Sequence, residues 1–162
     1  MTRANEKTTV IDNRLLDETS EAARTSPRRR KNHNFHVSEE QIVNRLLNAV
    51  EPGSYIQPHR HLDPNKDETF IVVRGRFGLV LFDEAGNVVH SAILAASADA
   101  VGANIPHGTY HTLVSLQPGS VFFEAKAGPY VPISDAERAP WAPGEGEPGA
   151  MEYLARLEQL FH

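Results

Sequence analysis

The chain has 162 residues, a formal net charge of −5 at pH 7 and no cysteine. A chain of this length can bury a core without disulfides, and the lack of thiols excludes cysteine zinc sites and a catalytic cysteine. The acidic balance argues against a nucleic-acid partner, and the short apolar runs and polar N-terminus argue against a membrane span or secretion signal, so we expect a cytoplasmic protein.

The N-terminal third is predicted to be helical and basic. Residues 1–14 form a polar end that we expect to be flexible. A helix is predicted over 15–24, because acidic residues stand early in this segment and Pro27 prevents its continuation. A second helix is predicted over 38–52, since Ser38 begins a capping box and apolar residues follow at helical spacing.

From Gly53 onward the sequence changes to short apolar or alternating segments bounded by turn residues, which predict strands. Many short strands at near-regular spacing indicate an all-β core, either a barrel or a sandwich. The predicted strands cover residues 55–61, 69–74, 77–82, 88–94, 100–105, 111–116 and 121–127.

The C-terminal part is predicted to be a surface arm followed by a helix. The segment 129–148 is rich in proline, glycine and alanine, and apolar residues from Met151 to Phe161 then recur at helical spacing. We therefore divide the single domain into a flexible end (1–14), a helical and basic segment packing on the barrel (15–52), a barrel (53–128), and an arm with a C-terminal helix (129–162).

Two histidines and a carboxylate in one short stretch have the spacing of a metal site. His59 and His61 would leave the same face of an extended strand, because strand side chains alternate. The next strand can bring Glu68 back beside them across a hairpin, with Asp63 and Asp67 as alternative carboxylates. A later strand supplies a third imidazole, from His111.

This ligand set determines which metals fit. Three imidazoles and one carboxylate suit one divalent first-row transition metal, with Fe, Mn, Ni and Zn as candidates. Calcium would need more oxygen ligands. Because such metals often take five or six ligands, positions would stay open for water, substrate or dioxygen, and the site could do chemistry.

The same residues resemble the two motifs of the cupin superfamily. The first motif is matched by Gly53, His59, His61, Glu68 and Gly75, with a longer gap than usual between His61 and Glu68, and the second by Gly102, Pro106, Gly108 and His111. The resemblance implies a single-domain double-stranded β-helix, which is a jelly-roll barrel, with short N-terminal and C-terminal helices. Cupins often have a strand just before the first motif, where the pattern of 38–52 predicts a helix.

Other segments are similar to the WbuC-type cupin metalloproteins. These are residues 26–33, 58–61, 123–130 and 141–145, and the resemblance extends over about 15–145. Members of that family are found in bacteria, some near surface-polysaccharide genes, and their reaction is not established. The resemblance therefore implies a fold and a metal, but no substrate.

Several residues outside the metal motif are candidates for contact with a substrate. Glu124 and Lys126 share one face of the last strand, so they are either pocket groups inside the barrel or an outward ion pair. His107 is either a pocket acid or base or a solvent-facing turn residue. The candidate catalytic residues are Glu124 and His107, and the candidate substrate-binding residues are Arg28, Arg30, Tyr55, Gln57 and Lys126.

Two classes of function fit these observations. The first is a metalloenzyme, a metal-dependent isomerase or an iron-dependent oxygenase, acting on a small sugar-like or carboxylate molecule. The family context connects this class with bacterial surface-polysaccharide metabolism. The second is a non-catalytic cupin that binds or senses a small molecule. In both classes we expect a small molecule as the partner, and neither a nucleic acid nor a membrane. The sequence is compatible with a homodimer.

Overall fold

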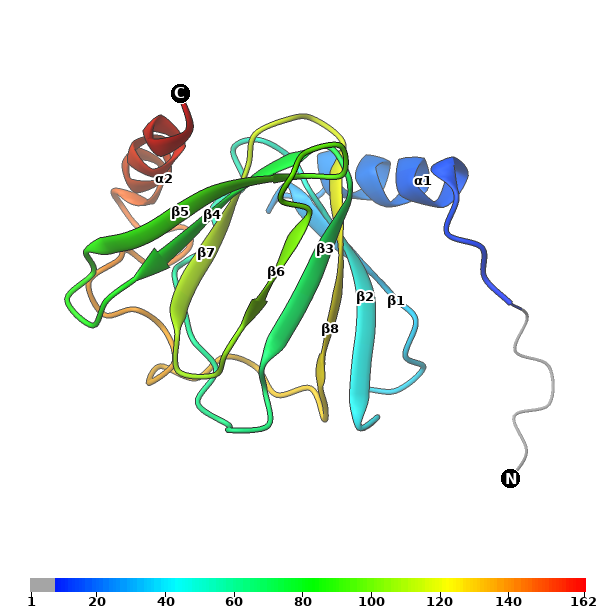
Figure 1. The fold of residues 1–162 in the computed structure, drawn as a ribbon, viewed down its shortest axis with the longest axis horizontal. Coiled ribbons are helices and arrows are strands. Elements are labelled where there is room, and N and C mark those ends of the chain that lie inside the picture. The colour runs from blue at the N-terminus through cyan, green and yellow to red at the C-terminus, as the bar shows by residue number, and fades with distance from the viewer. Residues whose placement is uncertain (1–7) are drawn as a thin grey trace.

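The computed structural model describes residues 8–162 and contains two antiparallel β-sheets (Figure 1). The larger sheet has the order β1-β2-β8-β3-β6 and the smaller one β5-β4-β7. The strands are β1 Arg30–Asn34, β2 Val43–Val50, β3 Glu68–Arg74, β4 Arg76–Phe82, β5 Val88–Ala95, β6 Gly102–Ile105, β7 Tyr110–Ser115 and β8 Ser120–Ala127. Residues 1–7 of the predicted flexible end lie outside the described residues, and its last two residues begin the first helix.

The main core lies between the two sheets. Phe70 of β3 and Phe122 of β8 meet Phe77 of β4 and Leu113 of β7, and all four side chains are buried. Every second residue of a strand points to this core, because strand side chains alternate between two faces. Burial of each such side chain contributes about 2 kcal/mol, and the packed core holds the strands that carry the site in place.

A helix covers the outer face of the larger sheet. Helix α1, Asn13–Arg24, begins after Asp12, whose side chain accepts a hydrogen bond from Leu15 N (3.0 Å). Its apolar stripe, which includes Leu15 and Leu16, packs on Leu47 of β2. The predicted helix over 15–24 is thus confirmed, with a start two residues earlier.

The C-terminal helix covers the outer face of the smaller sheet, on the other side of the molecule (Figure 1). Helix α2, Ala150–Glu158, continues into the 3₁₀ turn η1, Gln159–Phe161. Leu154 and Leu157 pack against Val80 of β4, and the predicted terminal helix is confirmed. Trp141 lies against Phe82 (ring centroids 4.8 Å apart) and attaches the preceding arm to the same sheet.

The helix predicted over 38–52 is wrong, because residues Val43–Val50 form strand β2. Leu46 and Val50 are buried toward the inside of the barrel, while Leu47 and Ala49 are buried beneath α1. A strand covered on both faces loses the simple alternation of apolar and polar residues, so its pattern resembles a buried helix.

The strand predicted over 55–61 is also wrong as a regular element. Only His59 forms bridges there, one with His111 and one with Arg138 of the arm. Pro58 has no N–H to donate to a ladder, although its carbonyl accepts a hydrogen bond from Ala139 N (2.9 Å). The other six predicted strands are confirmed, with ends that differ by at most two residues, whereas β1 was missed because its sequence is polar.

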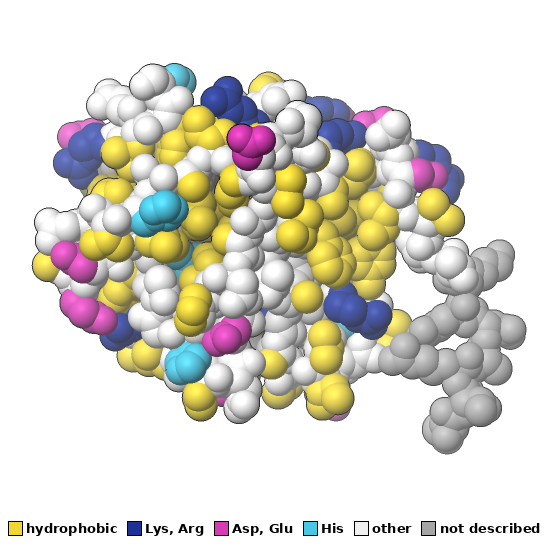
Figure 2. Space-filling view, viewed as in Figure 1, with side chains coloured by type: hydrophobic (Ala, Val, Ile, Leu, Met, Phe, Trp, Pro, Cys, Tyr) yellow, Lys and Arg dark blue, Asp and Glu magenta, His cyan; other side chains and the backbone are white. Residues whose placement is uncertain are grey.

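Surface charges are mixed on the face that Figure 2 shows. Lys and Arg lie there in separate groups, with acidic and apolar side chains between them. Within residues 8–162, no helix is long and apolar enough to cross a membrane. This face offers no continuous basic surface of the kind that phosphate backbones require.

Candidate metal centre

Four side chains converge at one end of the barrel. His59, His61, Glu68 and His111 each offer one ligand atom, and these atoms lie within 4.8 Å of one another. His59 is partly exposed and the other three are buried. The structure therefore brings together all four residues that the sequence predicted as metal ligands.

The backbone places the residues of this cluster beside one another. The bridge between His59 and His111 fixes these two residues opposite each other, because each backbone N–H donates to the other's carbonyl (3.1 and 2.9 Å). Glu68 is the first residue of β3, and its partners in the ladders are Ile105 of β6 and Lys126 of β8. Three parts of the barrel thus meet at one point.

Two of the imidazoles are held in the form that binds a metal. Gln57 O accepts a hydrogen bond from His59 Nδ1, and Thr109 O accepts one from His111 Nδ1, both at 2.9 Å. A carbonyl can only accept, so Nδ1 carries the proton and Nε2 of the neutral ring keeps its lone pair. His111 Nε2 is buried and has no hydrogen-bond partner among residues 8–162, and a metal ion would satisfy it.

Burial keeps these two histidines neutral. Desolvation lowers the pKa of His59 to about 3, and the nearby His111 adds to this effect. Desolvation also lowers the pKa of His111. Because metal ligands must be deprotonated imidazoles, the cluster is prepared for an ion at neutral pH.

Glu68 supplies the negative charge of the cluster. Its Oε2 lies 2.8 Å from His61 Nε2 and 3.9 Å from His111 Nε2. Burial alone would raise the pKa of Glu68, but the hydrogen bond from His61 and the charge of Lys126, 4.0 Å away, lower it. The carboxylate is therefore ionised, as a metal ligand must be.

The competing carboxylates lie elsewhere. Asp67 Oδ1 accepts hydrogen bonds from the backbone N of His107 (2.9 Å) and from its Nδ1 (3.0 Å). Asp63 Oδ1 accepts one from Asn65 N (2.9 Å) and closes a turn. The unusually long gap after His61 therefore forms a loop, and the structure does not bring His107, whose side chain is 46% exposed, to the cluster.

Glu124 and Lys126 lie inside the barrel beside the cluster. Lys126 Nζ is 2.7 Å from Glu124 Oε1 and 4.0 Å from Glu68 Oε2, and Asn48 Nδ2 donates to Glu124 Oε2 (2.8 Å). Burial and the charge of Glu68 raise the pKa of Glu124. Burial alone would lower the pKa of Lys126, but the charges of Glu124 and Glu68 raise it. Glu124 and Lys126 are therefore groups inside the barrel, and not an outward ion pair. Asn48 was missed, because its segment was expected to be helical.

A pocket of about 620 Å³, which we call the arm pocket, lies between the basic segment and the arm. Its wall includes Arg28, Arg30, Gln57 and His59, so three candidate substrate-binding residues share a pocket with a candidate metal ligand. Tyr55 does not line it, since its ring is in the core and its hydroxyl donates to the carbonyl of Pro143 (2.7 Å).

The arginines of this pocket are already paired. Glu145 of the arm accepts hydrogen bonds from Arg28 Nε and Nη2 (2.6 and 2.7 Å) and from Arg30 Nη2 (2.7 Å). These contacts lower the pKa of Glu145 to about 2. Glu145 was not among the predicted site residues, because nothing in a proline-rich arm marks one glutamate as the partner of a distant arginine pair.

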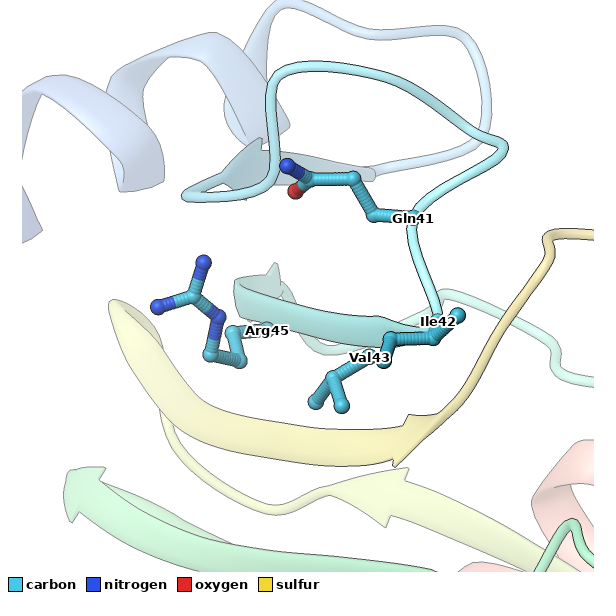
Figure 3. A pocket seen from close by; sticks show the side chains of 4 residues that line it. All are labelled: Gln41, Ile42, Val43 and Arg45. Atoms are coloured by element: carbon cyan, nitrogen blue, oxygen red, sulfur yellow. The ribbon is translucent and has the colours of Figure 1, made fainter. Parts of the chain in front are cut away.

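A second pocket, of about 380 Å³, lies at the start of β2 (Figure 3). It is lined by Gln41, Ile42, Val43 and Arg45. None of the predicted site residues lines it, so the candidate function belongs to the cluster and the arm pocket.

The chain belongs to the family described as "Domain of unknown function (DUF6016)", whose model matches residues 11–94. The match includes His59, His61 and Glu68 and ends within β5, before His111. No curated protein matches the chain.

Solved structures show which fold this family has. The chain is similar to KdgF from Halomonas sp. (TM-score 0.51, 20% identity, covering 66% of this chain and 85% of that chain). It is also similar to the conserved SPY1581 protein of unknown function from Streptococcus pyogenes (TM-score 0.52, 12% identity, covering 81% of this chain and 98% of that chain). A third similar structure is SO0799 from Shewanella oneidensis (TM-score 0.50, 15% identity, covering 62% of this chain and 68% of that chain). The fold is that of a single-domain jelly-roll cupin.

Proposed function

We propose that this chain is a WbuC-type cupin that holds one divalent transition metal, Fe, Mn, Ni or Zn, and acts on a small polar molecule. The metal ligands would be His59, His61, Glu68 and His111. The observation that carries the proposal is the convergence of these four residues within 4.8 Å, with the buried Nε2 of His111 left without a partner in residues 8–162. A bound ion would use that lone pair and neutralise the carboxylate.

The chemistry would be that of an isomerase or an oxygenase on a sugar-like or carboxylate molecule. A bound metal supplies Lewis acidity and polarises an oxygen of the substrate. Glu124 would be the group that accepts a proton, because it is a carboxylate buried beside Glu68 and its charge is balanced by Lys126 (2.7 Å). Asn48 orients this carboxylate through its hydrogen bond to Oε2.

The arm pocket is the proposed route to the metal. His59 is the only one of the four ligands that is not fully buried, and it lies on the wall of this pocket. Arg28, Arg30 and Gln57 on the same wall would contact the polar groups of a substrate. The resemblance to WbuC-type cupins supports a role in bacterial surface-polysaccharide metabolism, and we propose the cytoplasm as the location.

Elemental analysis of the purified protein tests the metal assignment. We expect close to one transition-metal ion per chain in the wild type, and its loss in the His59→Ala and His111→Ala variants, because each removes a donor. His107→Ala is the matched control, since this histidine is exposed and outside the cluster. Full metal content in both ligand variants would overturn the proposal.

A further inference from the structure

A pair of charged side chains, Lys126 and Glu124, lies beside the four candidate metal ligands without being one of them. Lys126 Nζ stands between two carboxylates, 2.7 Å from Glu124 Oε1 and 4.0 Å from Glu68 Oε2. The side chains of Glu124, Glu68 and Lys126 are only 7%, 8% and 20% exposed. Their charges are therefore poorly screened and act strongly on whatever binds beside them.

The contacts define the charge of this pair. Glu124 Oε2 accepts a hydrogen bond from Asn48 Nδ2 (2.8 Å), and Oε1 lies 2.7 Å from the ammonium of Lys126 as an ion pair without hydrogen-bond geometry. An ionised carboxylate has only acceptors, and an ammonium has only donors, so this arrangement fits one negative and one positive charge.

The charges can then be summed for the whole centre. Glu68 and Glu124 contribute two negative charges and Lys126 one positive charge, while ligand imidazoles are neutral. The protein groups thus carry one excess negative charge. A divalent ion changes this to one excess positive charge, which is costly in a buried site unless a further anion balances it.

We infer that the pair of Lys126 and Glu124 sets the charge of the metal centre so that its exchangeable ligand is a single monoanion, such as a monocarboxylate. This inference rests on the proposed function and names the ligand class of that site. A neutral ligand would leave the buried positive charge, and a dianion would reverse it. Lys126 is here a positioning residue that acts through charge, without contact to the ligand.

Two nearly isosteric variants test the inference through metal affinity, measured by competition with a fluorescent chelator. Lys126→Met removes a positive charge and should tighten metal binding, whereas Glu124→Gln removes a negative charge and should weaken it. For a unit charge a few ångströms away at an intermediate dielectric, each change should be about tenfold or more. Shifts in the same direction, or no shifts, would overturn the inference.

Anion binding gives a second readout, from the visible spectrum of the Co²⁺-loaded protein titrated with azide or with neutral imidazole. Azide affinity should rise about tenfold in Glu124→Gln and fall about tenfold in Lys126→Met, because one charge changes beside a charged ligand. Imidazole affinity should stay at the wild-type value. If azide and imidazole respond alike, charge does not select the ligand and the inference fails.

The double variant Glu124→Gln/Lys126→Met covers the case in which a lone buried charge prevents folding. It keeps the net charge of the centre, so it should keep wild-type affinity for both the metal and azide. A tenfold loss of azide binding would mean that Lys126 contacts the anion directly, and would overturn the charge balance. A wild-type protein that takes up no metal would instead contradict the proposed function, which separates the two failures.

Discussion

His59 and His111 lie opposite each other across a backbone bridge, with their rings tilted by 54° and their ring centroids 4.7 Å apart. Each ring is held by a carbonyl from its own segment, at Gln57 O and Thr109 O. Burial and the neighbouring His111 lower the pKa of His59, while burial, His61 and Lys126 lower that of His111, so protonation of both rings would be costly. The pair is stable only as two neutral imidazoles or as ligands of an ion.

The first prediction concerns the metal-free protein in mild acid. The pKa of His59 falls from 6.5 in the unfolded chain to about 3 in the native state, so below 6.5 only the unfolded chain takes up this proton. The free energy of unfolding should therefore decrease as the pH falls from 7 to 5, by up to about 1.4 kcal/mol per pH unit for each such histidine. Urea denaturation at several pH values measures this.

His59→Asn is the control for that titration, because it removes the proton site and keeps a polar side chain. Its unfolding free energy should fall less steeply over the same range. Equal slopes in His59→Asn and the wild type would show that His59 is not held neutral.

A second prediction compares two glycines of the cupin motifs, both at positive φ. A Cβ on Gly75 (φ 78°) would lie 2.2 Å from Ser120 Oγ and 2.7 Å from Ser120 Cα, whereas a Cβ on Gly108 (φ 79°) meets no described atom within 4 Å. Both alanine variants carry the backbone strain of about 1 kcal/mol, but only Gly75→Ala adds a clash with backbone. We expect losses of about 3 kcal/mol or more for Gly75→Ala and about 1 kcal/mol for Gly108→Ala. Similar melting temperatures for the two variants would contradict this.

The sequence was sufficient to predict which four residues converge and where most strands lie, but not which side chains contact them. His59, His61, Glu68 and His111 could be grouped from the spacing of the two motifs, although the segment that carries His59 and His61 is not a regular strand. The contact of Asn48 with Glu124 joins residues that are 76 positions apart, on two strands that are neighbours only in the folded sheet. Such pairings depend on strand order, which local patterns do not contain.

A third prediction concerns the attachment of the arm. Glu145 is 35% exposed and accepts three charge-assisted hydrogen bonds from Arg28 and Arg30, so Glu145→Gln should lower the free energy of unfolding by about 1 kcal/mol and increase proteolysis within 129–148. Asp17→Asn is the matched control, because it breaks an arginine pair of similar length (2.6 Å) at α1. Equal proteolysis of the arm in both variants would show that Glu145 does not hold it.

The same attachment should respond to acid. The pKa of Glu145 is lowered to about 2 from 4.5 in the unfolded chain, so its contribution is fully present above 4.5 and is lost as the pH falls toward 2. The stability difference between the wild type and Glu145→Gln should therefore shrink over this interval. A difference that stays constant down to pH 3 would mean that the carboxylate charge is not the cause.

The last prediction concerns metal removal and decides which carboxylate is the ligand. A metal at a hundredfold excess over its dissociation constant should raise the free energy of unfolding by about 2.7 kcal/mol, and EDTA should reverse this. Glu68→Gln keeps the shape of the side chain and an acceptor for His61 Nε2, so the metal-free protein should fold, but the neutral amide is a poor ligand. Thermal unfolding with and without metal should then show a large stabilisation in the wild type and in Asp63→Asn, and little in Glu68→Gln. Full metal stabilisation of Glu68→Gln would exclude Glu68 from the metal centre.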